Sequence, residues 1–199
     1  MLVSGGKSIY GARIGILMLE AQFPRIPGDM GNAETWPFPV LYKIVRGATP
    51  DRVVRKNAEG TLDRFIAAAE ELVSDGADAI TTNCGFLSIF QKELSAAVRV
   101  PVLTSSLMQV STVNMLLPDS KKAGILTISK STLSDAHLRA ANVPSDTPIG
   151  TTEDGVEFSR VILNDELELN IELARLDNIN AALKMKTDHP GLGAIILEC

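Results

Sequence analysis

Cysteine is scarce in this chain, which has only Cys84 and Cys199 among its 199 residues. Two thiols are too few for a disulfide scaffold, and in a reducing compartment we expect them to be free, although oxidation would allow them to pair. Histidine is equally scarce. His137 and His189 stand far apart in the sequence, so we expect both on the surface and predict no metal site. The sequence also lacks a P-loop and a Gly-x-Gly-x-x-Gly motif, which argues against a nucleotide cofactor.

Clusters of Lys or Arg are also missing, and the formal net charge is -5 at pH 7. An acidic chain without a basic patch is poorly suited to nucleic acid or to an anionic membrane surface, so we expect neither as a partner. No apolar stretch approaches the roughly 20 residues of a membrane span. The first residues lack the basic and apolar regions of a secretory signal. These absences predict a cytoplasmic protein whose ligand is a small molecule.

A short repeat ends on each of the two cysteines. Residues 76–84 (GADAITTNC) and 191–199 (GLGAIILEC) match at Gly, Ala, Ile and Cys with an offset of 115 residues. A Gly-Ile-Leu match at 15–17 and 124–126 precedes them with an offset of 109 residues. Each repeat contains an apolar run that predicts a buried strand. The pattern indicates two related half-molecules, each with a thiol at the carboxyl end of a strand, where open α/β sheets place their chemistry.

Strand-like and helix-like segments alternate along the chain, which predicts an α/β fold with mainly parallel sheets and crossover helices. We place the first lobe at residues 1–105 and the second at 106–199. Strands are expected at 12–19, 39–45, 78–84, 100–104, 123–129 and 191–199, and helices at 60–75, 87–98, 108–117, 134–142 and 156–187, the last with a break near 164–165. The stretch 144–155 is rich in turn residues and is expected to be irregular.

Two further segments carry specific expectations. Five residues of the long helix, Leu169, Leu173, Leu176, Ile179 and Leu183, have helical spacing and predict its buried stripe. The loop at 21–39 contains four prolines, a composition that opposes regular structure. This loop is either a lid over the end of the first strand or an ordinary surface or dimer-contact loop.

Two opposed thiols suit one kind of chemistry, in which one group removes a proton from a carbon and the other returns a proton to its opposite face. One thiol must then be ionised and the other protonated at the start. Cys84 is followed by Gly85 and a helical segment, so backbone amides at that turn could stabilise a thiolate. The alternative is that each cysteine is simply a small apolar residue at the end of a buried strand.

The segments TTNCGF (81–86), GILTIS (124–129) and AIILEC (194–199), in this order, resemble the aspartate/glutamate racemase superfamily, which also includes hydantoin racemases, maleate isomerases and arylmalonate decarboxylases. The resemblance implies two pseudo-symmetric flavodoxin-like lobes with the active site in the cleft between them. It implies an enzyme that needs no cofactor, with Cys84 and Cys199 as acid and base. Dimers are common in such families, so a homodimer is possible.

The same resemblance implies the substrate contacts. Asn83 and Gly85 flank the first thiol where family members contact the substrate. Ser129, Ser131 and Thr132 belong to a hydroxyl-rich turn that would hold a substrate carboxylate through its hydroxyls and amides. A helix cap is the alternative role for this turn.

On this basis the sequence predicts an isomerase, a PLP-independent racemase or epimerase of a small carboxylate-bearing substrate such as aspartate or glutamate. One alternative is a decarboxylase or cis-trans isomerase of the same superfamily that uses a single cysteine. Another is a non-catalytic small-molecule binding protein with the same fold.

Three departures from the family pattern bear on that prediction. The Asp-Ser pair near the end of the first strand of glutamate racemases corresponds here to Met18-Leu19-Glu20, so its acidic residue is either absent or replaced by Glu20, which argues against glutamate itself as the substrate. Arg25, in the proline-rich loop beside Asp29, is either a partner for a carboxylate or a solvated loop charge. Family members also continue beyond the second cysteine with strands and a helix that complete the first lobe. We therefore expect that the sequence is incomplete and that its activity is impaired.

Overall fold

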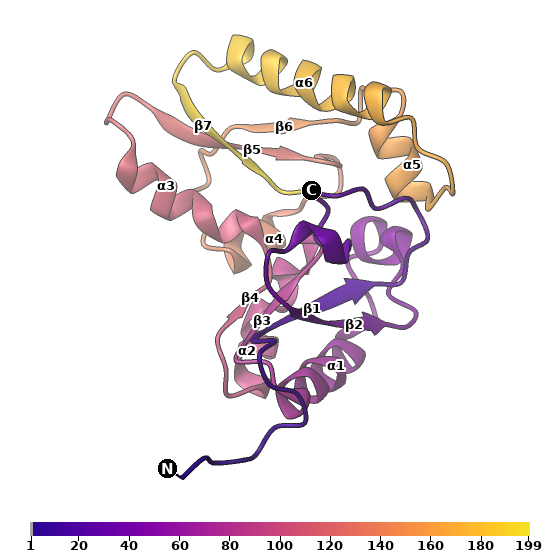
Figure 1. The fold of residues 1–199 in the computed structure, drawn as a ribbon. Coiled ribbons are helices and arrows are strands. Elements are labelled where there is room, and N and C mark those ends of the chain that lie inside the picture. The colour runs from indigo at the N-terminus through magenta and orange to yellow at the C-terminus, as the bar shows by residue number, and fades with distance from the viewer. Residues whose placement is uncertain (1) are drawn as a thin grey trace.

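The computed structural model describes residues 2–199 and contains two parallel sheets (Figure 1). The first has the order β2-β1-β3-β4 and the second the order β6-β5-β7. The strands are β1 (Ile14–Leu19), β2 (Val40–Val45), β3 (Ala79–Thr82), β4 (Val102–Leu103), β5 (Lys122–Thr127), β6 (Ile149–Thr151) and β7 (Leu192–Leu197). Every strand pairing in residues 2–199 is parallel. This arrangement confirms the predicted α/β class.

The two sheets share a common plan. The strands that carry Gly-Ile-Leu, β1 and β5, are central in their sheets, and the strands that lead to the cysteines, β3 and β7, lie directly beside them. The orders β2-β1-β3 and β6-β5-β7 therefore correspond strand for strand. The lobe boundary at residues 105 and 106 stays a prediction.

Helices connect the strands, as expected for parallel neighbours. The α-helices are α1 (Leu62–Asp75), α2 (Gln91–Ala97), α3 (Val110–Leu116), α4 (Asp135–Ala140), α5 (Phe158–Asn164) and α6 (Ile171–Asp188). Shorter 3₁₀ helices are η1 (Ala33–Thr35), η3 (Gly85–Phe90) and η4 (Ser106–Gln109), and η2 (Asp51–Arg55) is a π-helix. No helix within residues 2–199 is both long and apolar enough to cross a membrane.

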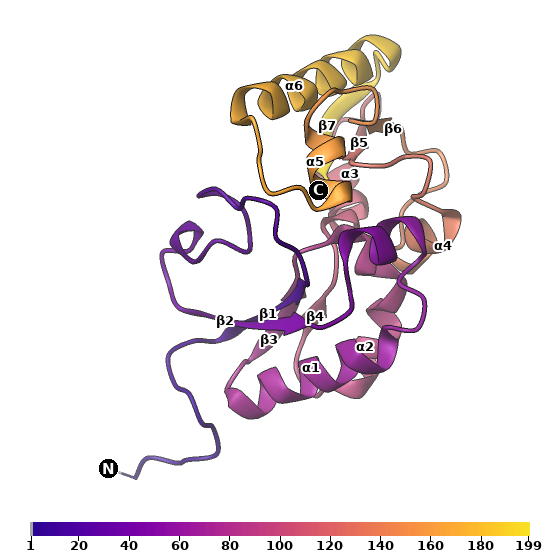
Figure 2. The ribbon, with the colours of Figure 1, turned by 90° about the vertical axis from the view of Figure 1, so that its right-hand side faces the viewer.

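The core of the first lobe lies between its sheet and α1. Helix α1 buries Phe65, Ala68, Ala69 and Leu72, which recur at the three-and-four spacing of one helix face. Figures 1 and 2 show α1 and α2 on the side of the first sheet that points away from the second sheet. The opposite side of this sheet lies toward the second sheet, and residues of both sheets line the cavity described below.

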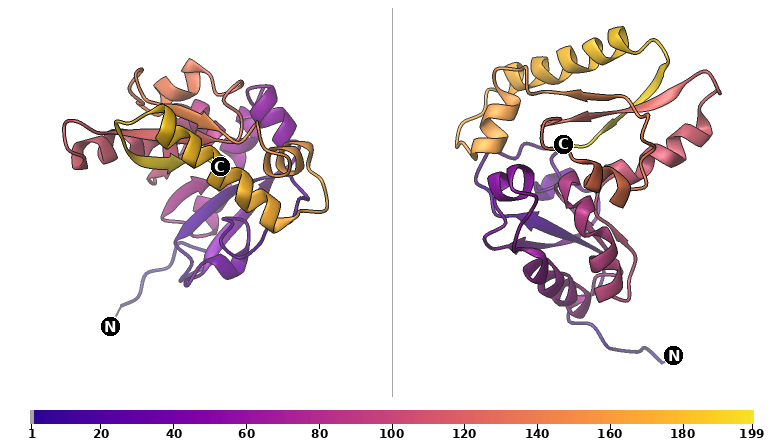
Figure 3. Two further views of the ribbon diagram at one scale, coloured as in Figure 1. Left: turned by 90° about the horizontal axis from the view of Figure 1, so that it is seen from above. Right: turned by 180° about the vertical axis from the view of Figure 1, so that it is seen from behind.

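Helix α6 contradicts the predicted leucine stripe. Leu176, Ile179 and Leu183 are 50%, 47% and 57% exposed, whereas Asp177 and Met185 are buried. Asp177 accepts hydrogen bonds from three backbone N–H groups at the start of α5, and Met185 packs where Gly150 of β6 leaves no Cβ. The face of α6 that carries Asp177 and Met185 therefore packs against the rest of the second lobe. Figure 3 shows α6 running along the second sheet.

Two smaller expectations are also corrected. Residues 149–151 form the edge strand β6, which is too short to show a strand pattern within its turn-rich surroundings. His137 is fully buried instead of exposed, because its ring closes a capping box with Ser134 and packs edge-on against Phe86. Burial lowers the pKa of His137. Among residues 2–199 no group of three or more His, Cys, Asp or Glu side chains could hold a metal ion.

Candidate functional site

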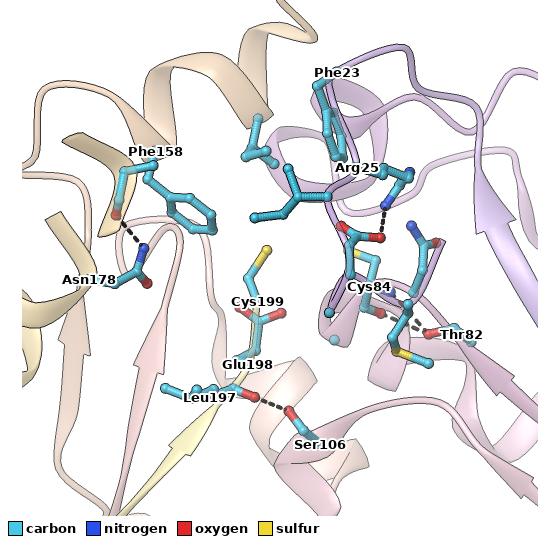
Figure 4. A pocket seen from close by; sticks show the side chains of 18 of the residues that line it. Phe23, Arg25, Thr82, Cys84, Ser106, Phe158, Asn178, Leu197, Glu198 and Cys199 are labelled. Atoms are coloured by element: carbon cyan, nitrogen blue, oxygen red, sulfur yellow. Dashed lines mark hydrogen bonds and ion pairs between the residues drawn. The ribbon is translucent and has the colours of Figure 1, made fainter. Parts of the chain in front are cut away.

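A cavity of about 790 Å³ lies between the two sheets (Figure 4). Its walls come from the carboxyl ends of β3, β4 and β7, from the proline-rich loop, and from α5 and α6. Four of the predicted site residues line it: Asn83, Cys84, Gly85 and Cys199. The two sulfur-bearing side chains approach the cavity from opposite sheets, as Figure 4 shows, and both are free thiols.

Cys84 is held by the strand end that precedes it. The Thr82 hydroxyl donates to the backbone oxygen of Thr104 at 2.7 Å and accepts a hydrogen bond from the backbone N–H of Cys84 at 3.4 Å. Cys84 has extended backbone geometry, and η3 begins at the next residue. Asn83 ties the same turn to β1, because its Oδ1 accepts from the backbone N–H of Leu19 at 2.8 Å.

The environment of Cys84 opposes ionisation of the empty site. Burial raises the pKa of its thiol to about 12, and the negative charge of Glu198 acts in the same direction. The backbone N–H of Phe86 and the guanidinium of Arg25 act in the opposite direction. A backbone amide after Cys84 therefore favours the thiolate, as predicted, but burial has a larger and opposite effect on the pKa.

Cys199 follows β7 and is the more exposed of the two thiols. The end of β7 is joined to η4, because the Ser106 hydroxyl donates to the backbone oxygen of Leu197 at 2.6 Å. The pKa of Cys199 is raised well above its ordinary value by the limited solvation inside the cavity and by the negative charge of Glu198. Ionised Cys84 and Asp29 would raise it further, and Arg25 alone opposes them.

Glu198 is a site residue that the sequence reasoning missed. It is only 5% exposed, and its Oε2 accepts a hydrogen bond from the Thr127 hydroxyl at 2.6 Å. Burial raises the pKa of Glu198 to about 7, although the Thr127 hydroxyl and the Ile128 amide favour the charged form. The only signal in the sequence was a single acidic residue between an apolar strand and a cysteine.

Arg25 also belongs to the cavity. Its Nη1 donates to Asp29 Oδ1 at 2.8 Å, and its guanidinium lies 4.4 Å from the centroid of the Phe23 ring. Its side chain is only 15% exposed, and its buried Nη2 has no hydrogen-bond partner. Of the two roles that the sequence left open for Arg25, this geometry favours the partner of a carboxylate.

The proline-rich loop is fastened to the second lobe. Asp165, at the end of α5, accepts hydrogen bonds at its Oδ1 from the backbone N–H groups of Gln22 and Phe23 at 2.6 and 3.0 Å. Residues 23–30 then line the cavity. The loop therefore covers the end of the first sheet, as the lid alternative expects.

The hydroxyl-rich turn of the second lobe does not line the cavity. It surrounds the carboxylate of Glu153, which accepts hydrogen bonds from Ser129 Oγ at 2.8 Å and from the Lys130 backbone N–H at 3.0 Å. Ser131 also bonds to this carboxylate, and Thr132 donates to Ser129 at 2.8 Å. Burial acts to raise the pKa of Glu153, but these hydrogen bonds lower it overall. The turn thus holds an anion from its own chain, and its role toward a substrate stays a prediction.

Comparison with curated proteins links the chain to lyases. No model of a known protein family matches it. The dimethylsulfoniopropionate lyase of Durusdinium sp. clade D is 25% identical over 200 residues, which cover 96% of this chain and 66% of that protein. Dimethylsulfoniopropionate lyase 3 of Emiliania huxleyi is 26% identical over 196 residues, which cover 94% of this chain and 51% of that protein. The chain spans between half and two thirds of the length of these relatives.

These relatives overturn the predicted reaction class. The expectation of an isomerase, an amino-acid racemase, is wrong, because the similar curated proteins are named lyases. They agree better with the alternative stated above, a decarboxylase or cis-trans isomerase of the same superfamily that uses a single cysteine, than with a racemase.

Solved structures agree on the architecture. Arylmalonate decarboxylase, in a Gly-to-Cys variant, has a TM-score of 0.60 and 15% identity, covering 93% of this chain and 77% of its own. An aspartate racemase homologue from Pyrococcus horikoshii has a TM-score of 0.54 and 17% identity, covering 94% of this chain and 84% of its own. At such low identity the likeness concerns the fold alone. The chain has the two-sheet α/β fold of aspartate racemase homologues and arylmalonate decarboxylase.

Proposed function

We propose that this chain carries the active site of a lyase that eliminates a leaving group from a small carboxylate-bearing substrate. Dimethylsulfoniopropionate, the substrate named for the curated relatives, is the compound we propose. One observation carries the proposal: the thiol of Cys84 and the guanidinium of Arg25, whose Nη2 has no hydrogen-bond partner, line the same cavity. The similarity to lyases extends over more than nine tenths of the chain.

The proposed reaction is a β-elimination. A base removes a proton from the carbon beside the carboxylate, and the electron pair of that C–H bond forms a carbon-carbon double bond. The C–S bond breaks, and its electrons leave on sulfur as neutral dimethyl sulfide, so the other products are acrylate and a proton. Because the leaving group needs no proton, one base is sufficient, in contrast to proton transfer on two faces of a carbon.

Cys84 is the better candidate for that base. The Phe86 amide and the Arg25 guanidinium both favour its thiolate. Burial and the anionic groups Glu198 and Asp29 raise the pKa of Cys199, so it is expected to stay a protonated thiol in the opposite wall. A correctly placed general base contributes about 10²- to 10⁴-fold to a rate.

Arg25 is the proposed partner of the substrate carboxylate. Removal of the neighbouring proton pushes negative charge toward that carboxylate, so a hydrogen bond from Nη2 becomes stronger as the reaction proceeds. Phe158, Ile162 and Leu169 form an apolar part of the wall from the second lobe. This part suits the methyl groups of the leaving sulfide and keeps water away from the thiolate.

Proton NMR tests this function directly. The protein is incubated in D₂O with dimethylsulfoniopropionate and, separately, with aspartate and glutamate. We expect alkene signals of acrylate and a methyl signal of dimethyl sulfide from the first compound only. Failure to form an alkene from the sulfonium substrate, or exchange of the α-proton of an amino acid, would contradict the proposal.

A further inference from the structure

The carboxyl group of Glu198 lies in the cavity wall with one oxygen unsatisfied. Its Oε2 is bonded to Thr127, but its Oε1 is buried and has no hydrogen-bond partner. Buried polar atoms are rarely left in this state, because an unpaired group loses the hydrogen bonds that water would supply. A proton on Oε1, or a water molecule from the cavity, would satisfy it.

The position of Oε1 brings it next to the turn that carries Cys84. A Cβ atom at Gly85 would lie 2.5 Å from Oε1, so the carboxyl group occupies space that only a glycine leaves free. Thr127 contacts this carboxyl group from β5, and Cys199 follows it directly in the sequence. The negative charge of Glu198 raises the pKa of both thiols, and the positive charge of Arg25 acts to lower the pKa of both.

We propose that Glu198 is the proton-exchange partner of Cys84, an inference that rests on the proposed elimination. After each turnover the thiol of Cys84 carries the proton taken from the substrate. Glu198 first releases its own proton to solvent and becomes a carboxylate. The S–H bond then breaks, an O–H bond forms at Oε1 of Glu198, and the electron pair stays on sulfur, which restores a thiolate beside a protonated carboxyl group. Water in the cavity would carry the proton between the two groups.

This pairing solves a problem of charge in a poorly solvated site. A thiolate beside a carboxylate would place two negative charges close together where water screens them weakly. If the proton moves between the two groups, the site holds one negative charge both before and after the transfer. The pKa of Glu198, raised to about 7 by burial, lets it hold or release a proton at neutral pH. Glu198 acts through Cys84 and is therefore a positioning residue.

The pairing is tested by alkylation of the thiols with iodoacetamide as a function of pH, with mass spectrometry to follow the Cys84 peptide separately from the Cys199 peptide. Coupled groups lose their protons in two steps. We expect Cys84 reactivity to rise once near pH 7, as the pair loses its first proton, and again at much higher pH. In Glu198→Gln the step near pH 7 is lost, and the remaining step moves to lower pH because the repelling charge is absent.

Two variants separate proton exchange from a structural role. In Thr127→Val the carboxylate loses a stabilising hydrogen bond, so the first step moves to higher pH but persists. Glu153→Gln is the matched control, because Glu153 is another carboxylate of the second lobe that hydroxyl groups hold, and it does not line the cavity. We expect its profile to match that of the parent protein.

The inference is overturned if Glu198→Gln keeps the step near pH 7, or if the parent protein has none. Since alkylation requires no substrate, this result is independent of the elimination reaction. A protein that forms no alkene but loses the step in Glu198→Gln refutes the lyase proposal and leaves the pairing supported. A protein that eliminates dimethyl sulfide with an unchanged Glu198→Gln profile refutes the pairing alone.

Discussion

Glu198 lies so close to Gly85 that a Cβ atom at position 85 would come within 2.5 Å of Oε1 and 2.9 Å of the Glu198 backbone oxygen. The side chain of Glu198 could rotate, but its backbone oxygen is fixed beside the β5–β7 pairing, where the Glu198 N–H donates to Leu126 at 2.9 Å. The two sheets therefore approach each other through this glycine.

Gly85→Ala should push the two sheets apart at the site. We expect a loss of stability of about 1 to 3 kcal/mol, typical of an overpacked interior, and a loss of elimination activity of at least about tenfold from misplacement of Cys84. Gly191→Ala is the control, because its nearest neighbour, Ser120 O, would be 3.7 Å away. Chemical denaturation and initial rates measure both effects. Equal stability and activity of the two variants would refute this close approach.

Arg25→Met should weaken substrate binding. Loss of a hydrogen bond to a charged group costs about 1.5 to 3 kcal/mol, which corresponds to a rise in KM of about 10- to 100-fold. Arg46→Met is a suitable control, because Arg46 also pairs with a carboxylate, Glu20, at 2.8 Å but is 76% exposed outside the cavity. Steady-state kinetics with dimethylsulfoniopropionate provide the comparison. An unchanged KM in Arg25→Met would remove Arg25 from the carboxylate site.

Asp165→Ala should loosen the loop that covers the cavity. The substitution removes the acceptor of the Gln22 and Phe23 N–H groups. Asp165 has a positive φ of 54°, which Asn tolerates well, so Asp165→Asn keeps both the backbone geometry and an oxygen acceptor. We expect faster amide hydrogen exchange at residues 22 and 23 in the alanine variant and near-parental exchange in the asparagine variant. Identical exchange in both variants would show that Asp165 does not hold the loop.

The sequence predicted the framework of the site well. The apolar runs that became β1, β3, β5 and β7 are short, buried and bounded by polar or glycine residues, which is a strong local signal. The repeat placed each cysteine at the carboxyl end of a strand, and two related half-molecules with a cleft between them placed both thiols at one cavity. Local pattern and strand direction were sufficient for these features.

The residues that complete the site depended on contacts distant in sequence. The buried carboxyl group of Glu198 is hydrogen-bonded to Thr127, which is 71 positions away. The side chain of Arg25 reaches the cavity because the proline-rich loop folds over it. The turn at Ser129 has the composition of an anion site, but the contact of its hydroxyl with the carboxylate of Glu153 joins residues 24 positions apart. The apolar stripe of α6 was recognised as a periodic pattern, but periodicity does not say which face meets a sheet.

Glu198 should also leave a signature in the pH dependence of folding. Its pKa rises from the ordinary value of 4.5 to about 7 on folding, so the folded protein binds this proton more tightly than the unfolded chain. The contribution is present below about pH 4.5 and is lost as the pH rises through about 7. A shift of this size corresponds to about 3 kcal/mol.

We therefore expect the parent protein to lose stability relative to Glu198→Gln between about pH 5 and pH 8. Urea unfolding of both proteins at several pH values measures the difference, and the lowered pKa values of other carboxylates cancel in this comparison. Parallel curves for the two proteins would contradict the raised pKa of Glu198.

Release of dimethyl sulfide, measured in the headspace over the parent protein, Cys84→Ser and Cys199→Ser, tests the central claim most directly. If Cys84 is the base, Cys84→Ser should lose about 10²- to 10⁴-fold in rate, whereas Cys199→Ser should retain most of its activity because the sulfide leaves without a proton. Release from Cys84→Ser at the parental rate, or no release from the parent protein, would contradict the account.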